Sequence, residues 1–104
     1  MSLDITLIAY APNEVYSANY THNVVPMWKL AGVYGALYGS DGMTAIAICP
    51  TLLKGYQDMK KYPKKYRALN PSNGWGHYDT AMKFIKNLYN QCKKYPDSII
   101  HISA

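Results

Sequence analysis

The chain has 104 residues, of which 49% are hydrophobic and 16% are charged, and its formal net charge is +5. This length leaves no room for a second core, and the hydrophobic share excludes a disordered chain. We therefore expect residues 1–104 to form one compact domain. Eleven tyrosines against one phenylalanine favour a shallow core or a sticky interface, because a tyrosine ring packs while its hydroxyl keeps a polar partner.

The N-terminal segment predicts a strand. Residues 5–10 are short, apolar and rich in β-formers, and Pro12-Asn13 bounds them. The following residues, 14–23, mix tyrosines with small polar residues and are hard to assign. They allow a second short strand at about residues 15–20.

A helix is predicted from residue 24 or 25 to residue 38. Asn23 is placed to cap it, and Pro26 is tolerated in the first turn, where no backbone N–H is needed. Apolar residues recur along it at helical spacing. The residues expected on its inner face are Met27, Leu30, Ala31, Tyr34, Leu37 and Tyr38.

A second helix is predicted at residues 45–61, after the turn at residues 39–42 and with Thr44 as its cap. Pro50 conflicts with a regular helix there, because an interior proline removes a backbone donor and crowds the preceding turn. The helix either starts near Pro50 or is kinked, and we favour an early start with a distortion. The expected inner face is Ile48, Leu52, Leu53, Tyr56 and Met59.

The C-terminal half adds a short helical segment, a long helix and a strand. Residues 64–69 predict one or two helical turns, and residues 78–94 predict a helix with one apolar stripe. Residues 98–103, with three isoleucines, predict a terminal strand. The pattern indicates an α+β fold in which about three helices pack on a small sheet formed by the N- and C-terminal strands.

The segment Asn70–Tyr78, with the sequence NPSNGWGHY, directly precedes the last predicted helix. Its glycines and Asn73 permit positive φ angles, and backbone amides near a helix start can face an anion or a ring. Two interpretations stay open. The segment is a binding loop, or it is a capped turn in which Trp75 fills the core.

Residues 20–23 form a second polar segment that leads into a helix. If the two segments meet, they enclose a pocket suited to a nucleotide-like anion, because helix N-termini favour negative charge, asparagines read base edges and aromatic rings stack. The candidate ligand-binding residues are Thr21, His22, Asn23, Asn70, Asn73, Trp75, His77 and Tyr78.

The same residues also have structural interpretations. Asn23 then caps the first helix, and His22 bonds to the backbone. Asn70 fixes the turn before Pro71, and Trp75 belongs to the core. The sequence leaves both sets of roles open.

No pattern predicts catalysis or metal binding. Cys49 and Cys92 lie among apolar neighbours, which favours buried free thiols, although their separation allows a disulfide. The histidines form no close cluster, so we expect no metal site. Asp58 is expected to make a solvated ion pair on a helix exterior. We predict no catalytic residue and no cofactor.

Basic residues concentrate at residues 60–67, interleaved with Tyr62 and Tyr66. Such a run suits a nucleic-acid backbone or a solvated helix end. No known nucleic-acid-binding motif accompanies it, so nucleic acid is the least supported partner.

No stretch approaches the roughly 20 apolar residues of a membrane span, and no secretion signal is evident. We expect a soluble, cytoplasmic protein with no membrane partner.

A set of short segments spread along the chain carries a resemblance to known proteins. These segments are Thr21-His22-Asn23, Met27, Trp28, Ala31–Tyr34, Asn70–Tyr78 and Cys92–Asp97. They resemble a family of small proteins from phages and prophages. The resemblance covers roughly residues 15–104, and the N-terminal strand segment departs from the family pattern. The family has no assigned activity, so the resemblance implies a phage context and the host-cell cytoplasm rather than a mechanism.

A small phage protein without catalytic patterns suggests a binder that neutralises a host component. We expect a non-enzymatic accessory protein that binds a small anionic, nucleotide-like ligand between the two polar segments, in a counter-defence role. The alternative is an interaction module whose tyrosine-rich face binds a host protein or a second copy of the chain, as a homo-oligomer. A weak nucleic-acid binder is the third hypothesis.

Overall fold

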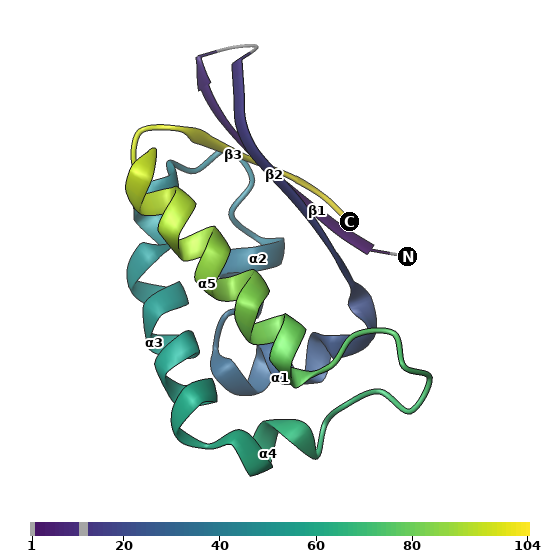
Figure 1. Cartoon of the computed structure of the whole chain (residues 1–104). Coiled ribbons are helices and arrows are strands. Elements are labelled where there is room, and N and C mark those ends of the chain that lie inside the picture. Colours follow the sequence, from purple (N-terminus) through teal and green to yellow (C-terminus); the bar gives the residue numbers. More distant parts are fainter. Residues whose placement is uncertain (1, 11–12) are drawn as a thin grey trace.

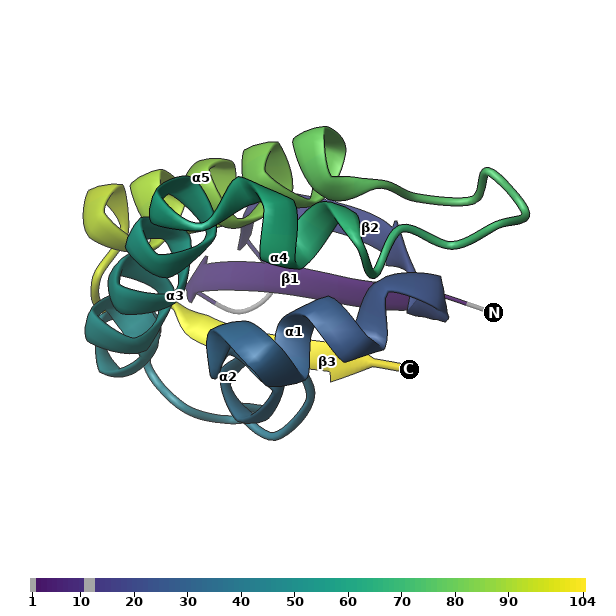
Figure 2. The same ribbon diagram turned by 90° about the horizontal axis from the view of Figure 1, so that it is seen from below.

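A three-stranded antiparallel sheet packs against a layer of helices. The computed structural model describes residues 2–10 and 13–104. Strands β1 (Ser2–Tyr10), β2 (Asn13–Thr21) and β3 (Ile99–Ser103) are ordered β2-β1-β3, and the helices cover one face of this sheet (Figures 1 and 2). The α+β class and the sheet shared by the two ends of the chain are confirmed. The second strand is present and is longer than expected.

The central strand β1 separates a buried face of the sheet from a polar one. Leu3, Ile5 and Leu7 are fully buried, while Asp4 between them is exposed. Side chains alternate across a strand, so every second residue of β1 points into the core. On the outer face the Asn19 amide of β2 donates to Asp4 Oδ1 at 2.8 Å.

The prediction of a single helix up to residue 38 is wrong, because the helix ends at Gly32 and a second one follows. A 3-10 turn, η1 (His22–Val24), leads into α1 (Val25–Ala31), and α2 (Tyr34–Tyr38) follows as a separate helix. Gly32 has a φ of 78°, a left-handed conformation that ends a helix and that glycine adopts without strain. Of the predicted inner face, Met27 and Leu37 are fully buried but Leu30 and Tyr34 are exposed, and Trp28, which was not assigned to that face, is fully buried.

Pro50 lies in the first turn of a helix and not in its interior. A 3-10 turn, η2 (Ala45–Ile48), precedes α3 (Cys49–Lys61), so Pro50 removes no helical hydrogen bond. The expected early start at residue 45 is therefore a 3-10 turn, and Thr44 makes no side-chain cap.

The last helix, α5 (Tyr78–Lys94), has the predicted bounds, and it follows the short helix α4 (Pro63–Arg67). It lies beside α3 in both views (Figures 1 and 2). Its predicted stripe is buried except for the half-buried Tyr89; the fully or almost fully buried members are Ala81, Phe84, Ile85, Leu88 and Cys92.

An aromatic cluster joins the sheet to the helices. The Trp28 ring centroid lies 5.8 Å from that of Tyr20 on β2 and 5.9 Å from that of Phe84 on α5. Trp28 is fully buried, and within the described residues its Nε1–H has no hydrogen-bond acceptor. Trp28 therefore contributes apolar contact and not polar bonding.

Candidate functional site

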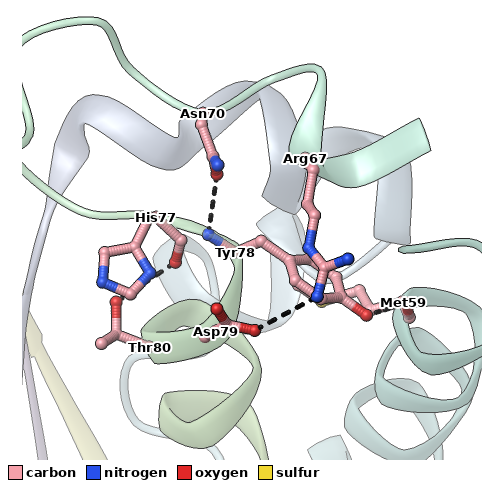
Figure 3. A network of polar contacts seen from close by, with 7 residues as sticks. All are labelled: Met59, Arg67, Asn70, His77, Tyr78, Asp79 and Thr80. Carbon is pink, nitrogen blue, oxygen red and sulfur yellow. Dashed lines mark hydrogen bonds and ion pairs between the residues drawn. The ribbon is translucent and has the colours of Figure 1, made fainter. Parts of the chain in front are cut away.

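The segment between α4 and α5 forms a projecting loop, residues 70–77, which extends beyond the helical layer (Figure 2). The side chains of its two asparagines hydrogen-bond to backbone groups of the loop and of the α5 start. Asn73 Oδ1 accepts a hydrogen bond from the Trp75 N–H at 2.9 Å, and Asn70 Oδ1 accepts one from the Tyr78 N–H at 2.8 Å (Figure 3). Both amide oxygens, predicted to read a ligand, therefore satisfy backbone donors of the loop and of the α5 start.

Tyr78 anchors the C-terminal end of this loop. Its side chain is buried, and its hydroxyl donates to the Met59 carbonyl on α3 at 2.6 Å (Figure 3). The Arg67 guanidinium covers its ring at 4.9 Å and lies 3.7 Å from Asp79. Burial raises the pKa of Tyr78, so the hydroxyl stays protonated and donating at neutral pH. Tyr78 is thus a structural residue and not a free ligand contact.

The two polar segments do meet, as the pocket hypothesis required. The Tyr20 hydroxyl accepts from the His77 N–H at 3.3 Å. A Cβ atom on Gly76 would lie only 2.6 Å from Thr21 Cγ2 and 3.0 Å from Val24 Cγ1, so only glycine fits without rearrangement. The segments therefore pack directly against each other at this point, and the hollows that the structure describes lie elsewhere.

His22 and Asn23 take roles that differ from both expectations. His22 Nδ1 hydrogen-bonds to the Tyr38 hydroxyl at 2.7 Å, so its partner is a side chain and not the backbone. Asn23 does not cap the helix, since the Thr21 hydroxyl accepts from the Asn23 N–H at 3.2 Å. Thr21 was grouped with the ligand contacts, and instead it caps η1.

The core-plug interpretation of Trp75 is wrong. Its side chain is 69% exposed, whereas Trp28 fills the core. His77, two residues further along the chain, is also exposed. Of the eight predicted residues, Trp75 and His77 therefore present free side-chain surface on this loop, while Asn70, Asn73 and Tyr78 maintain its shape.

The two thiols are buried and unreactive in character. Burial raises the pKa of Cys92 to about 12, with the neighbouring Cys49 as a further cause, and burial also raises the pKa of Cys49. A protonated thiol is a poor nucleophile, so neither side chain is suited to covalent catalysis at neutral pH. Across residues 2–10 and 13–104, no three His, Cys, Asp or Glu side chains gather as a metal site.

Asp58 has a partner that the sequence did not predict. It accepts a hydrogen bond from the buried Tyr66 hydroxyl, which ties α3 to α4, and Lys65 Nζ lies 4.0 Å away. Burial, and then the bond to Asp58, raise the pKa of Tyr66. The spacing of eight residues across Pro63 hid this pair, because it crosses from one helix to the next.

A basic hollow lies beside this pair, between the C-terminal end of α1 (residues 30–32), the outer face of α3, and Tyr62 with Lys65. Its volume is about 560 Å³. We name it the lysine hollow. Lys54 and Lys61, seven residues apart, lie on one helix face, so the sequence held a signal for a basic patch on this helix.

Comparisons of the chain with protein-family models, with curated proteins and with solved structures gave no match. None of the helices in the described part of the chain has the length and apolar character needed to span a membrane. The account of this site therefore depends on the geometry of this chain alone.

Proposed function

We propose that the protein is a non-enzymatic interaction module that inserts Trp75 into an apolar pocket of a protein partner. The observation that carries this proposal is the 69% exposure of an indole on a loop whose polar groups are already bonded. Tryptophan is the residue most enriched among energetically dominant interface contacts, and a solvent-exposed indole gains free energy when a partner buries it.

The construction of the loop supports a binding role. Asn70, Asn73 and Gly76 each hold the backbone in one arrangement, through hydrogen bonds or close contact with Thr21. A loop that is already ordered loses little conformational entropy on binding, so more of the contact energy appears as affinity. Its convex shape favours insertion into a partner over enclosure of a small ligand, so we do not place a nucleotide between the two segments.

The expected partner is an acidic protein. The neighbouring helix α4 presents Lys64, Lys65 and Arg67, all exposed, and the chain carries a net charge of +5. Charges of opposite sign around an interface raise the association rate and favour the correct partner. We further propose that this partner is a bacterial host protein and that the role is counter-defence; this part of the proposal comes from the phage context expected from the sequence and not from the structure.

The test uses the immobilised full-length protein to capture partners from a bacterial extract, with Trp75→Ala and Tyr62→Ala compared side by side. Tyr62 is the matched control, since its ring is also exposed, at 43%, but lies outside the loop. A partner captured by the wild type and by Tyr62→Ala, but lost with Trp75→Ala, is then purified for calorimetry. We expect Trp75→Ala to weaken its binding by at least about 2 kcal/mol, or roughly 30-fold.

Equal binding of one purified partner to the wild type and to both variants contradicts the proposal. So does an extract in which no captured protein depends on Trp75. Size-exclusion chromatography of the wild type and Trp75→Ala separates self-association from capture of another protein, because only a homo-oligomer held by Trp75 changes its elution volume in the absence of extract.

A further inference from the structure

Helices α1 and α3 approach each other closely beside the lysine hollow. Gly55 on α3 lies so close to α1 that a Cβ atom there would be 3.1 Å from the Ala31 carbonyl oxygen and 2.3 Å from Val33 Cγ1. The two helices are therefore in backbone contact beside the hollow, and a side chain at position 55 would push them apart. The backbones of the two helices beside the hollow are therefore closely packed, while the lysine side chains that line it are exposed.

The charges that line this hollow are predominantly positive. Lys54, Lys61 and Lys65 face a single carboxylate, Asp58. That carboxylate is already occupied, because it accepts the Tyr66 hydroxyl and lies 4.0 Å from Lys65 Nζ. Within the described part of the chain neither Lys54 nor Lys61 is in an ion pair, so both ammonium groups are available to an anion.

One side of the hollow is apolar and aromatic. Leu30 is 41% exposed at the end of α1, and the exposed Tyr62 ring also lines the hollow. Lys61 Nζ and Lys65 Nζ lie 5.4 Å and 4.8 Å from the centroid of that ring, so the ring and the two ammonium groups lie close together. A volume of about 560 Å³ falls within the range of small-molecule sites.

We propose that the lysine hollow binds a nucleoside phosphate. Lys54 and Lys61 bind its phosphate oxygens by charge-assisted hydrogen bonds, and the base lies against Leu30 and the Tyr62 ring. The Gln57 side chain, between the two lysines on α3, supplies a donor and an acceptor for the polar edge of the base or the sugar. This site is separate from the Trp75 loop, so it is independent of the proposed protein partner.

The test is an NMR titration of the labelled full-length protein with adenosine diphosphate, compared with inorganic phosphate and a ten-residue oligothymidylate. We expect saturable shifts of the Gly32, Gln57 and Tyr62 amides with the nucleotide, and weaker binding of phosphate alone. Lys54→Gln with Lys61→Gln should weaken the affinity by about tenfold or more, because the charge-assisted hydrogen bonds to the phosphate are lost.

The matched control is Lys83→Gln with Lys86→Gln, which removes the same charge from α5, outside the lysine hollow. It should change the affinity for the nucleotide by less than about twofold. Trp75→Ala should leave nucleotide binding unchanged, which separates this proposal from the one above. All three variant proteins should keep the wild-type melting temperature within a few degrees, because the substituted side chains are exposed.

Three results would overturn the proposal. One is the absence of shifts at about 10 mM nucleotide, far above a specific dissociation constant. Another is an equal loss of affinity in the two lysine pairs, which indicates attraction by net charge alone. The last is binding of the oligothymidylate, steeply weakened by salt, without binding of the nucleotide, which assigns the surface to nucleic acid.

Discussion

The two tryptophans of this protein lie in opposite environments. Trp28 on α1 is fully buried against Tyr20 and Phe84, and Trp75 on the projecting loop is 69% exposed. Around Trp28 the neighbours are apolar, and its indole N–H has no acceptor in the described residues. Around Trp75 the neighbouring groups are polar and bonded to each other.

The difference in burial assigns Trp28 to the stability of the fold and, under our proposal, Trp75 to binding. Burial of the Trp28 side chain removes apolar surface from water and so stabilises the fold. The exposed Trp75 side chain buries little apolar surface and so adds little to the stability of the fold. Its loop nevertheless keeps two asparagine hydrogen bonds and a close approach at Gly76 that maintain its shape. Under our proposal, these contacts hold the loop so that it presents the indole to a partner.

The largest expected effect comes from Trp28→Ala. It removes a fully buried aromatic side chain and leaves a cavity beside Tyr20 and Phe84. We expect the free energy of unfolding to fall by about 3–5 kcal/mol, measured by urea denaturation. Trp75→Ala serves as its control and should change stability by less than about 0.5 kcal/mol. Equal losses in the two variants would remove the contrast between the two regions.

Asn70→Ala should have an intermediate effect. It takes away the acceptor for the Tyr78 N–H at the start of α5, and that donor then has to find water. We expect a loss of about 1–2 kcal/mol in the free energy of unfolding, together with faster amide exchange in residues 70–77. Asn23→Ala, which alters an exposed side chain that makes no cap, is the control. Unchanged exchange in Asn70→Ala would show that other contacts hold the loop.

A smaller effect is expected from alkaline pH at the junction of α3 and α4. Burial and the bond to Asp58 raise the pKa of Tyr66 above that of an unfolded tyrosine. The folded state therefore holds this proton more tightly, so stability is constant below the ordinary tyrosine pKa and falls as the pH rises above about 10. Urea denaturation between about pH 8 and pH 11 measures this decline.

Tyr66→Phe should start about 1 kcal/mol less stable and then decline less steeply with pH, because the titrating hydroxyl is gone. A decline as steep as that of the wild type would assign the alkaline loss to other groups, such as Tyr78, whose pKa burial also raises.

Sequence patterns predicted the elements that depend on local periodicity. The apolar stripe of α5 and the β-forming ends of the chain lead directly to the helix bounds and to the shared sheet. The break at Gly32 was missed because the apolar spacing continues through it, and only the left-handed glycine reveals it. The Asp58–Tyr66 bond is a contact between two helices and leaves no trace in spacing.

The candidate loop was located by its composition, but its internal roles were not. Asn70 and Asn73 have the same side chain whether they bind a ligand or the backbone, so their sequence leaves both roles open. Trp28 and Trp75 are likewise indistinguishable by residue type. Which indole is buried depends on the helix that faces the sheet, and this is decided by packing of distant segments.

The most direct test of the central claim is acrylamide quenching of selectively excited tryptophan fluorescence in Trp28→Phe, where Trp75 is the only tryptophan. Phenylalanine keeps an aromatic ring against Phe84 and removes the unpartnered N–H, so the fold is preserved; Trp75→Phe provides the buried reference. We expect Trp75 to emit at the wavelength of a water-exposed indole and to be quenched almost as strongly as a free tryptophan derivative. Blue-shifted and protected emission from Trp75 would contradict the account, because the loop would then contribute its indole to the core and not to a partner.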